Sequence, residues 1–243
     1  MKQAHYLHPH ITTGKIRVIM VGCGGNGSNM LMGLASLNTA LREMTDRFLD
    51  VHVIDDDVVS QANLGRQPFY PCDVGRSKAV TLVERINYAH GLAWTAQQAR
   101  FTRDMHAPCD LLISCVDTAA SRREIQASAS RKNARYWLDL GNRARDGQFI
   151  LGTTKRYTHT LALPSVMDMF PELADESIPE DDAPSCSLAE ALQKQSLFMN
   201  RVLSSHALDL LFNLLCRGSI TNAGGFLNLA SGYASPVPLP KMA

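Results

Sequence analysis

Several features that would assign this chain of 243 residues to a specialised class of protein are absent. No run of lysine and arginine exceeds two residues and the formal net charge is +1, so nothing predicts attraction to nucleic acid or to a membrane surface. The N-terminus lacks the apolar core of a secretion signal. The longest apolar stretch, Leu208 to Leu215, is too short to span a bilayer. We therefore expect a cytoplasmic protein with no nucleic-acid or membrane partner.

Paired cysteines are also missing. The six cysteines, at positions 23, 72, 109, 115, 186 and 216, include no C-x-x-C pair. Structural zinc sites typically use such pairs, so we expect no zinc. In a chain of this size without a secretion signal, we expect the cysteines to be free thiols.

Short apolar runs alternate with segments of helical spacing along the chain. The expected strands are residues 16–21, 50–56, 92–101, 110–116, 135–141 and 147–153, and the expected helices are residues 26–43, 75–91 and 119–131. This alternation predicts an α/β fold, a Rossmann-like, doubly wound, mostly parallel sheet with helices on both faces. A C-terminal helix and a short strand extension complete it.

Three segments fall outside the alternating pattern. Residues 1–15 are expected to form a tail, with its three histidines in solvent. Residues 165–185 are acidic and rich in proline, which is typical of a long surface loop. A capping box at residues 187–190 starts the helix behind that loop. Residues 221–240 are expected to form a turn, a short strand and an extended tail.

The stretch RVIMVGCGGNGSNM, residues 17–30, places G-x-G-x-x-G between a strand and a helix. Gly22, Gly24 and Gly27 would let the backbone turn sharply and approach a phosphate, and the helix N-terminus would supply donors. The alternative is a tight turn that binds no ligand. Asp55 ends the next expected strand, where a dinucleotide-binding fold has an acid for the ribose hydroxyls.

A dense polar segment follows Asp55. Asn63, Arg66, Gln67 and Lys78 are expected to converge on the crevice beside the glycine loop. Arginine offers a planar fork for phosphate oxygens, and lysine offers a compact charge. Two cations beside a glycine loop favour a triphosphate over a dinucleotide.

Four motifs in order, GCGGNG, DDDVVSQANLGRQ, GRSKA and SCVDTAASR, resemble the ThiF/MoeB adenylyltransferases, relatives of the ubiquitin-activating enzymes. The family motif D-x-D-x-V-x-x-x-N-L-x-R-Q is matched by Asp55, Asp57, Val58, Asn63, Leu64, Arg66 and Gln67. This resemblance covers about residues 14–145. The remainder looks more like the ThiF-type proteins of PRTRC cassettes, gene clusters that also carry ubiquitin-like and conjugating-enzyme-like proteins.

The resemblance implies a site for ATP and Mg2+. The residues implied to bind ATP are Gly22, Gly24, Gly25, Gly27, Asp55, Asp57, Asn63, Arg66, Gln67 and Lys78. Of these, Arg66 and Lys78 would also be catalytic, because they would contact the departing pyrophosphate. Asp117 would bind Mg2+, and one carboxylate is often enough for a cation that bridges phosphates. An acid favoured by a helix dipole is the alternative for Asp117.

The implied reaction is ATP-dependent adenylation of the C-terminal carboxylate of a small ubiquitin-like or sulfur-carrier protein of the β-grasp type. The resemblance also implies a dimer, and a conjugating-enzyme-like protein as a second partner. We expect a single domain over residues 1–243. Residues 16–145 would form the nucleotide-binding core, and residues 146–243 would bind the carrier or form the dimer interface.

Cys186 precedes the capped helix at residues 187–190, and its placement resembles that of the cysteine in ThiF that accepts the activated acyl group. A helix N-terminus favours the thiolate. The alternative is a cysteine that packs as a small hydrophobic side chain. The sequence lacks the paired C-x-x-C motifs of many family members, and no arginine precedes Arg17, which we place on a strand.

Two other functions remain open at this stage. A catalytically weak nucleotide-binding partner subunit would keep the same binding residues. An NAD-dependent oxidoreductase is compatible with the glycine loop and Asp55. The set of Asn63, Arg66, Lys78 and Asp117 argues against the oxidoreductase.

Overall fold

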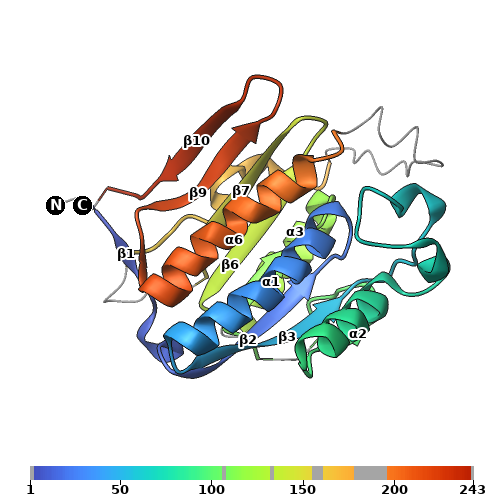
Figure 1. Ribbon diagram of the computed structural model, residues 1–243. Helices are drawn as coiled ribbons and strands as arrows, with labels where there is room; N and C mark the ends of the chain where they lie inside the picture. Colours follow the sequence, from blue (N-terminus) through green and yellow to red (C-terminus); the bar gives the residue numbers. More distant parts are fainter. Residues whose placement is uncertain (1–2, 106–107, 132–133, 155–160, 178–195, 242–243) are drawn as a thin grey trace.

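The computed structural model describes residues 3–105, 108–131, 134–154, 161–177 and 196–241. These residues form an eight-stranded sheet with helices on both of its faces (Figure 1). The strands are β2 (Gly14–Val21), β3 (Arg47–Ile54), β4 (Thr95–Gln97), β5 (Leu111–Ser114), β6 (Tyr136–Asn142), β7 (Asp146–Thr153), β9 (Asn222–Asn228) and β10 (Tyr233–Pro238).

The strand order is β10-β9-β7-β6-β5-β2-β3-β4. The strands β6, β5, β2, β3 and β4 are parallel to one another. Strand β7 runs antiparallel to β6, β9 runs antiparallel to β7, and β10 runs antiparallel to β9. The chain leaves β2 toward β3 on one side, and it later leaves β5 toward β6 on the other. This order confirms the predicted Rossmann-like, doubly wound α/β fold.

Helices α1 (Gly25–Met44), α2 (Lys78–His90) and α6 (Met199–Arg217) lie on one face of the sheet, and α3 (Ala119–Arg131) lies on the other (Figure 1). The central strands are buried on both sides. Val18 and Met20 pack into the larger core with α1 and α6, while Ile19 and Val21 pack into a second core with α3. This double burial accounts for the almost uninterrupted apolar runs in the sequence.

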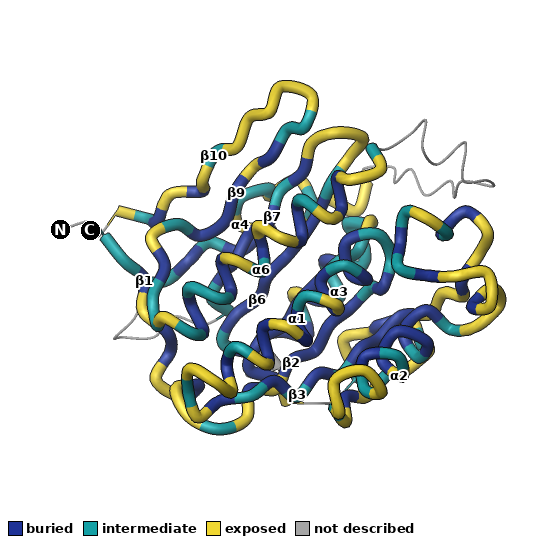
Figure 2. Tube along the Cα trace, viewed as in Figure 1, coloured by how far each residue is buried: buried dark blue, intermediate teal, exposed yellow. Residues whose placement is uncertain are grey.

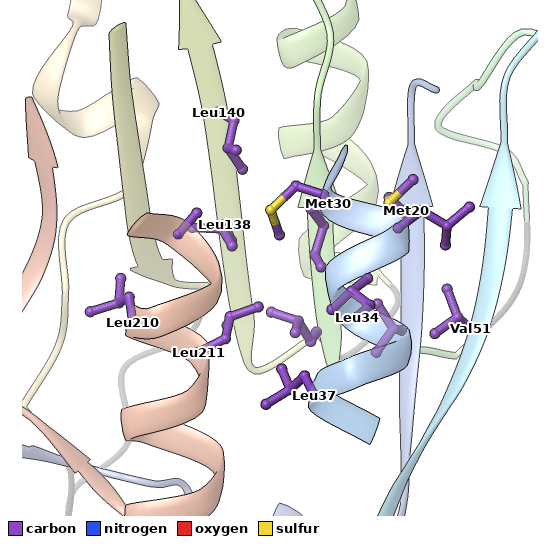
Figure 3. Close-up of a cluster of buried hydrophobic side chains, with 14 of the residues drawn as sticks. Met20, Met30, Leu34, Leu37, Val51, Leu138, Leu140, Leu210 and Leu211 are labelled. Carbon is purple, nitrogen blue, oxygen red and sulfur yellow. The ribbon is translucent and has the colours of Figure 1, made fainter. Parts of the chain in front are cut away.

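Apolar side chains of α1, α6 and the sheet meet in the larger core (Figure 3). Met30 and Leu34 of α1 lie against the sheet, beside Leu211 of α6. The sheet-facing sides of these helices are buried while their outer sides are exposed (Figure 2). Each fully buried Leu or Met side chain stabilises the fold by roughly 1.5–3 kcal/mol, so this packing holds the helices against the sheet.

The prediction that the N-terminal histidines lie in solvent is wrong for two of the three. Residues His5–Tyr6 form β1, which pairs with β8 (Ser219–Ile220), and a short 3-10 helix, η1 (Pro9–Ile11), follows. His5 is fully buried and His8 is nearly so, whereas His10 is exposed. A buried polar side chain needs hydrogen-bond partners. The ring of His5 has two, because Nδ1 lies 2.7 Å from the Leu161 carbonyl oxygen and Nε2 lies 3.0 Å from the Tyr136 hydroxyl.

The expected loop at residues 165–185 is only partly described, and its described part is helical. Ser165 caps α4 (Val166–Met169), and a 3-10 helix, η4 (Pro171–Ala174), follows. Ser165 and Asp168 form a capping box, a signal that the sequence contained. Residues 178–195, with the capping box at 187–190 and Cys186, lie outside the described residues.

The C-terminal segment differs from the turn, short strand and extended tail that we expected. It forms a two-stranded hairpin, β9 and β10, that extends the sheet past β7 (Figure 1). Gly224 has a φ of 151°, and a Cβ there would lie 2.0 Å from the Phe149 carbonyl oxygen. A glycine is therefore what lets β9 approach β7. The expected strand at 92–101 is limited to β4, because only Thr95–Gln97 pair with β3.

Candidate functional site

The loops that follow β2 and β5 meet at the edge of the sheet where the chain reverses its direction of winding. In doubly wound sheets, ligands bind in the crevice at this point, outside the carboxyl ends of the strands. The glycine loop runs from β2 into α1 here, and the segment from Cys115 to Thr118 runs from β5 into α3. The N-terminus of α1, a helix of 20 residues, also lies at this edge.

The glycines of the loop differ in what surrounds them. Gly22 has a φ of 92°, and a Cβ would lie 2.5 Å from the Cys115 carbonyl oxygen. At Gly27 a Cβ would lie 1.9 Å from the Gly22 carbonyl oxygen, and at Gly25 it would lie 2.2 Å from the Asn200 side chain. No described atom lies within 4 Å of a Cβ at Gly24. Packing therefore explains three of these glycines, and Gly24 presents bare backbone to open space.

Asp55 ties the glycine loop to the end of β3. The backbone N–H of Cys23 donates to one carboxylate oxygen of Asp55, and the N–H of Asp57 donates to the other at 2.8 Å. Asp55 is buried, which raises its pKa, while these hydrogen bonds and the charge of Lys78 oppose the rise. The structure thus gives Asp55 a role in holding the loop, and its contact with a ribose stays a prediction.

Lys78 stands at the start of α2 and faces the same corner. Its ammonium donates to Asp57 Oδ2 at 2.6 Å, and its backbone N–H donates to the Asp57 carbonyl at 3.1 Å. The Lys78 side chain is buried, while that of Asp57 is 64% exposed. The structure therefore brings Asp55, Asp57 and Lys78 together beside the glycine loop.

Asn63, Arg66 and Gln67 belong to the turn between β3 and α2. The 3-10 helix η2 (Gln61–Asn63) begins with a capping box in which Asn63 Oδ1 accepts from the Ser60 N–H at 2.8 Å. Gln67 is buried, and its Oε1 has no hydrogen-bond partner among the described residues. Arg66 is half-buried, and burial lowers its pKa. The turn therefore holds the Asn63 side chain in place through this capping box.

Asp117 is exposed after β5, and its carboxylate has no hydrogen-bond or ion-pair partner within the described ranges. Thr118 caps α3, because its Oγ1 accepts from the Ser121 N–H at 3.1 Å. An acid next to a helix N-terminus and a metal ligand are both compatible with this position. A second group of acids, Asp55 to Asp57, offers oxygens within 4.8 Å of one another, although Lys78 already pairs with Asp57.

The structure also shows a polar network that the sequence analysis missed. Arg122 of α3 is paired with Asp139 of β6, and Ser114 and Trp137 complete the network. Burial raises the pKa of the Asp139 carboxyl, and the charge of Arg122 opposes the rise. The available signal was a carboxylate in the middle of the apolar run RYWLDLG, because a buried acid needs a cation or donors.

The cysteines fall into two groups by exposure. Cys23 and Cys115 flank the glycine loop, and burial raises the pKa of both thiols. Cys72 is exposed on the turn before α2. The five cysteines in the described ranges are free, as expected. Cys186 lies outside those ranges.

A cavity of about 370 Å3 lies away from this edge, between α6 and the β9–β10 hairpin. None of its lining residues belongs to the expected site. Within the described ranges, no helix is both long and apolar enough to cross a membrane.

Three comparisons relate the chain to known proteins. Mouse ubiquitin-like modifier-activating enzyme 6 is 25% identical over 183 residues, which are 71% of this chain and 16% of the mouse protein. The sulfur carrier protein ThiS adenylyltransferase of Escherichia coli (strain K12) is 28% identical over 123 residues, 48% of this chain and 45% of that protein. The crystal structure of E. coli MccB matches with a TM-score of 0.63 at 14% identity, over 93% of this chain and 63% of MccB.

The chain thus spans less than half of the two curated relatives and under two thirds of the MccB chain. The likeness to MccB concerns the fold alone. A family model, described as the ThiF family, matches residues 12–238 and so takes in every described element of the site. By this match the chain belongs to the ThiF family.

Proposed function

We propose that this chain binds ATP and Mg2+ and adenylates the C-terminal carboxylate of a small ubiquitin-like or sulfur-carrier protein. The observation that carries the proposal is the bare backbone at Gly24, at the N-terminus of α1 and beside the paired Asp57 and Lys78. The names of the two curated relatives, a modifier-activating enzyme and a carrier-protein adenylyltransferase, support the same reaction.

The residues at this edge fit a nucleoside triphosphate. The glycine loop and the start of α1 supply N–H donors and the positive end of a helix dipole, which favour phosphate oxygens. Lys78 is a cation whose charge acts on Asp55 and Cys23 at that loop, and Arg66 is a second cation on the turn before α2. Asp55 would hold the ribose through its carboxylate oxygens, which already accept from the Cys23 N–H of the loop and from the Asp57 N–H.

The residues also fit a hard cation, because the Asp117 carboxylate, which has no partner among the described residues, stands on the segment next to the glycine loop. Oxygen ligands from one or two carboxylates, completed by phosphates and water, are what Mg2+ uses. When bound, Mg2+ would neutralise charge on the phosphates. Asp117 would hold it, and Asp57 would keep Lys78 oriented.

In the proposed reaction, an oxygen of the carrier carboxylate forms a bond to the α-phosphorus. The bond from that phosphorus to the bridging oxygen breaks, and pyrophosphate leaves with its electrons. No side chain has to remove a proton, because the carboxylate is already ionised. Arg66, Lys78 and Asn63 would contribute position and charge neutralisation, the main sources of catalysis in phosphate transfer.

The finer parts of the proposal concern partners and later steps. A dimer, a conjugating-enzyme-like partner, membership of a PRTRC cassette and acyl transfer to Cys186 all rest on the resemblance in sequence. A partner subunit without catalysis would keep the same fold and the same binding residues. The difference between the two functions is whether adenylation occurs.

Pyrophosphate exchange tests the proposal directly. The chain is mixed with ATP, Mg2+, labelled pyrophosphate and the small glycine-ending β-grasp protein expected in the same gene cluster, and we expect label in ATP only when the carrier is present. Lys78→Met should abolish exchange. Arg76→Met is the matched control, because Arg76 is an exposed cation two residues away that pairs with Glu84 and should be dispensable.

Two results would count against the proposal. ATP binding without exchange would favour the partner-subunit function. Tighter binding of NAD than of ATP in calorimetry would favour an oxidoreductase and contradict adenylation.

A further inference from the structure

A buried guanidinium holds the backbone of the segment that carries Asp117. Arg122 Nη2 donates to the Val116 carbonyl at 2.7 Å, and Nη1 donates to the carbonyls of Asp117 and Thr118 at 3.4 and 3.5 Å. The Arg122 side chain is only 7% exposed. The carbonyls of Val116, Asp117 and Thr118 therefore share one side-chain donor, and that of Thr118 also accepts from the Arg122 backbone N–H at 3.3 Å.

Asp139 sets the position of that guanidinium. Arg122 Nε donates to both carboxylate oxygens of Asp139, at 3.1 and 3.2 Å, and Asp139 is fully buried. Ser114 Oγ donates to Asp139 Oδ1 at 2.5 Å, and the Trp137 indole N–H donates to Ser114 Oγ at 2.7 Å. Ser114 and Asp139 are direct neighbours in the β5–β6 pairing, so the sheet itself fixes the carboxylate.

The geometry is specific to arginine at this point. One planar fork joins a carboxylate on β6 to three carbonyls of the loop after β5, and a lysine could not make these contacts together. Gly141 leaves the space for it, because a Cβ at that position would lie 2.9 Å from Arg122 Nη2. The network thus connects the rigid centre of the sheet to an exposed acid whose side chain has no hydrogen-bond or ion-pair partner in the described part of the chain.

We infer that Arg122 and Asp139 are positioning residues for Asp117, which they place for binding a divalent cation next to ATP. This inference rests on the proposed function and adds the residues that set its metal affinity. Partners of this kind, one step removed from a ligand, commonly change metal affinity by about 10- to 100-fold when they are lost.

The test measures metal binding apart from turnover. Mn2+ replaces Mg2+ as the probe, and its binding to the protein with ATP is followed by electron paramagnetic resonance. We expect Asp139→Asn to weaken Mn2+ binding about ten-fold or more, with ATP binding in EDTA close to that of the wild type. Ser114→Ala should shift Mn2+ binding in the same direction by less.

A matched control exists at the opposite end of the same strands. Asp110, just before β5, is also buried and accepts from Arg17 through the backbone N–H and the guanidinium, at 2.9 to 3.2 Å. Asp110→Asn removes the same charge from the same sheet far from Asp117. Its Mn2+ affinity should stay within about two-fold of the wild type, whatever happens to thermal stability.

A second variant covers the case in which Asp139→Asn does not fold. Arg122→Met combined with Asp139→Leu removes both charges, and apolar replacement of a whole buried pair is usually tolerated. The folded double variant should still bind Mn2+ about ten-fold more weakly, because the carbonyls have lost their clamp. Wild-type Mn2+ affinity in either variant, or an equal loss in Asp110→Asn, would overturn the inference.

The inference and the proposed function can fail separately. Exchange activity in the wild type together with unchanged Mn2+ affinity in the variants rejects only the positioning role. Weakened Mn2+ binding in the variants of a chain that shows no exchange supports the positioning role and rejects adenylation.

Discussion

Alanine at two glycines of the same loop should affect different properties. Gly27→Ala should mainly lower stability, and Gly24→Ala should mainly lower the affinity for ATP. At Gly27 the Cβ would lie 1.9 Å from the Gly22 carbonyl oxygen, whereas at Gly24 it would meet nothing within 4 Å. The first position joins α1 to the end of β2, and the second faces open space. The two variants therefore distinguish two explanations of the glycine loop, a turn that only packing requires and a loop that binds a phosphate.

The expected magnitudes follow from these contacts. In Gly27→Ala two backbone segments must move apart by about 1 Å, and overpacking of this kind costs about 3 kcal/mol. For a chain of this size the melting temperature should fall by about 6–12 °C. Gly24 has a φ of −71° and a ψ of −145°, a combination outside the main regions for residues with a Cβ. Gly24→Ala therefore costs backbone strain of about 1–2 kcal/mol, which is still less than the cost at Gly27.

The affinity for ATP should depend on Gly24, the position where stability changes less. Calorimetry with ATP and Mg2+ should find Gly24→Ala at least about ten-fold weaker than the wild type, a loss of about 1.4 kcal/mol, because the methyl group stands where the phosphate approaches. Differential scanning calorimetry on the same samples gives the stability. Wild-type ATP affinity in Gly24→Ala would refute the phosphate role of the loop. A large loss of stability in Gly24→Ala would refute the structural reasoning itself.

Two further predictions concern other parts of the chain. If Cys186 accepts the acyl group, Cys186→Ser should keep pyrophosphate exchange but lose any thiol-sensitive adduct with the carrier, whereas the exposed Cys72, changed to serine as a control, should keep both. An adduct that persists in Cys186→Ser would exclude it as the acceptor. Burial lowers the pKa of His5 below its unfolded value near 6.5, so the unfolded state binds the proton more readily and stability should fall as the pH drops below about 6.5. Thermal unfolding from pH 8 to 5 should show this fall reduced in His5→Gln, and equal curves would contradict it.

The elements that the sequence predicted well are those whose signals are local. The run of residues 16–21 is apolar because β2 is buried on both faces, and Gly91 ends α2 in the left-handed conformation that favours glycine. The order of strands and helices then limits the topology to a few doubly wound arrangements. For these reasons both the fold class and the carboxyl edge of the sheet could be located from the sequence.

The errors came from partners that are distant in the sequence. His5 is buried because Tyr136 and Leu161 supply its hydrogen bonds, and no local pattern marks those residues as neighbours. Where the structure has the hairpin of β9 and β10, we expected a turn, a short strand and an extended tail. Pro236 and Pro238 of β10 are unusual residues in a strand. At the edge of a sheet they are tolerated, since the missing N–H groups have no strand to bond.

Sequence motifs named candidate site residues but did not separate their roles. Asp57 and Lys78 do meet, and Asp55 does stand at the glycine loop. The structure adds that Gly22 and Gly27 are explained by packing, so a match to G-x-G-x-x-G is evidence for a ligand mainly through Gly24. A motif records which residues are needed at a turn, and only the surrounding atoms show why each is needed.

The same reasoning extends the site beyond the motifs into α6. Gly25 must be a glycine because the Asn200 side chain occupies the space of a Cβ, and Ser204 Oγ donates to the Asn26 carbonyl at 3.1 Å. Helices α1 and α6 lie side by side over the sheet (Figure 1). The start of α1, where a phosphate would bind, is therefore held in part by residues near 200. A position as late as Asn200 can change nucleotide affinity without any contact to the ligand, because it sets where the donors of α1 point.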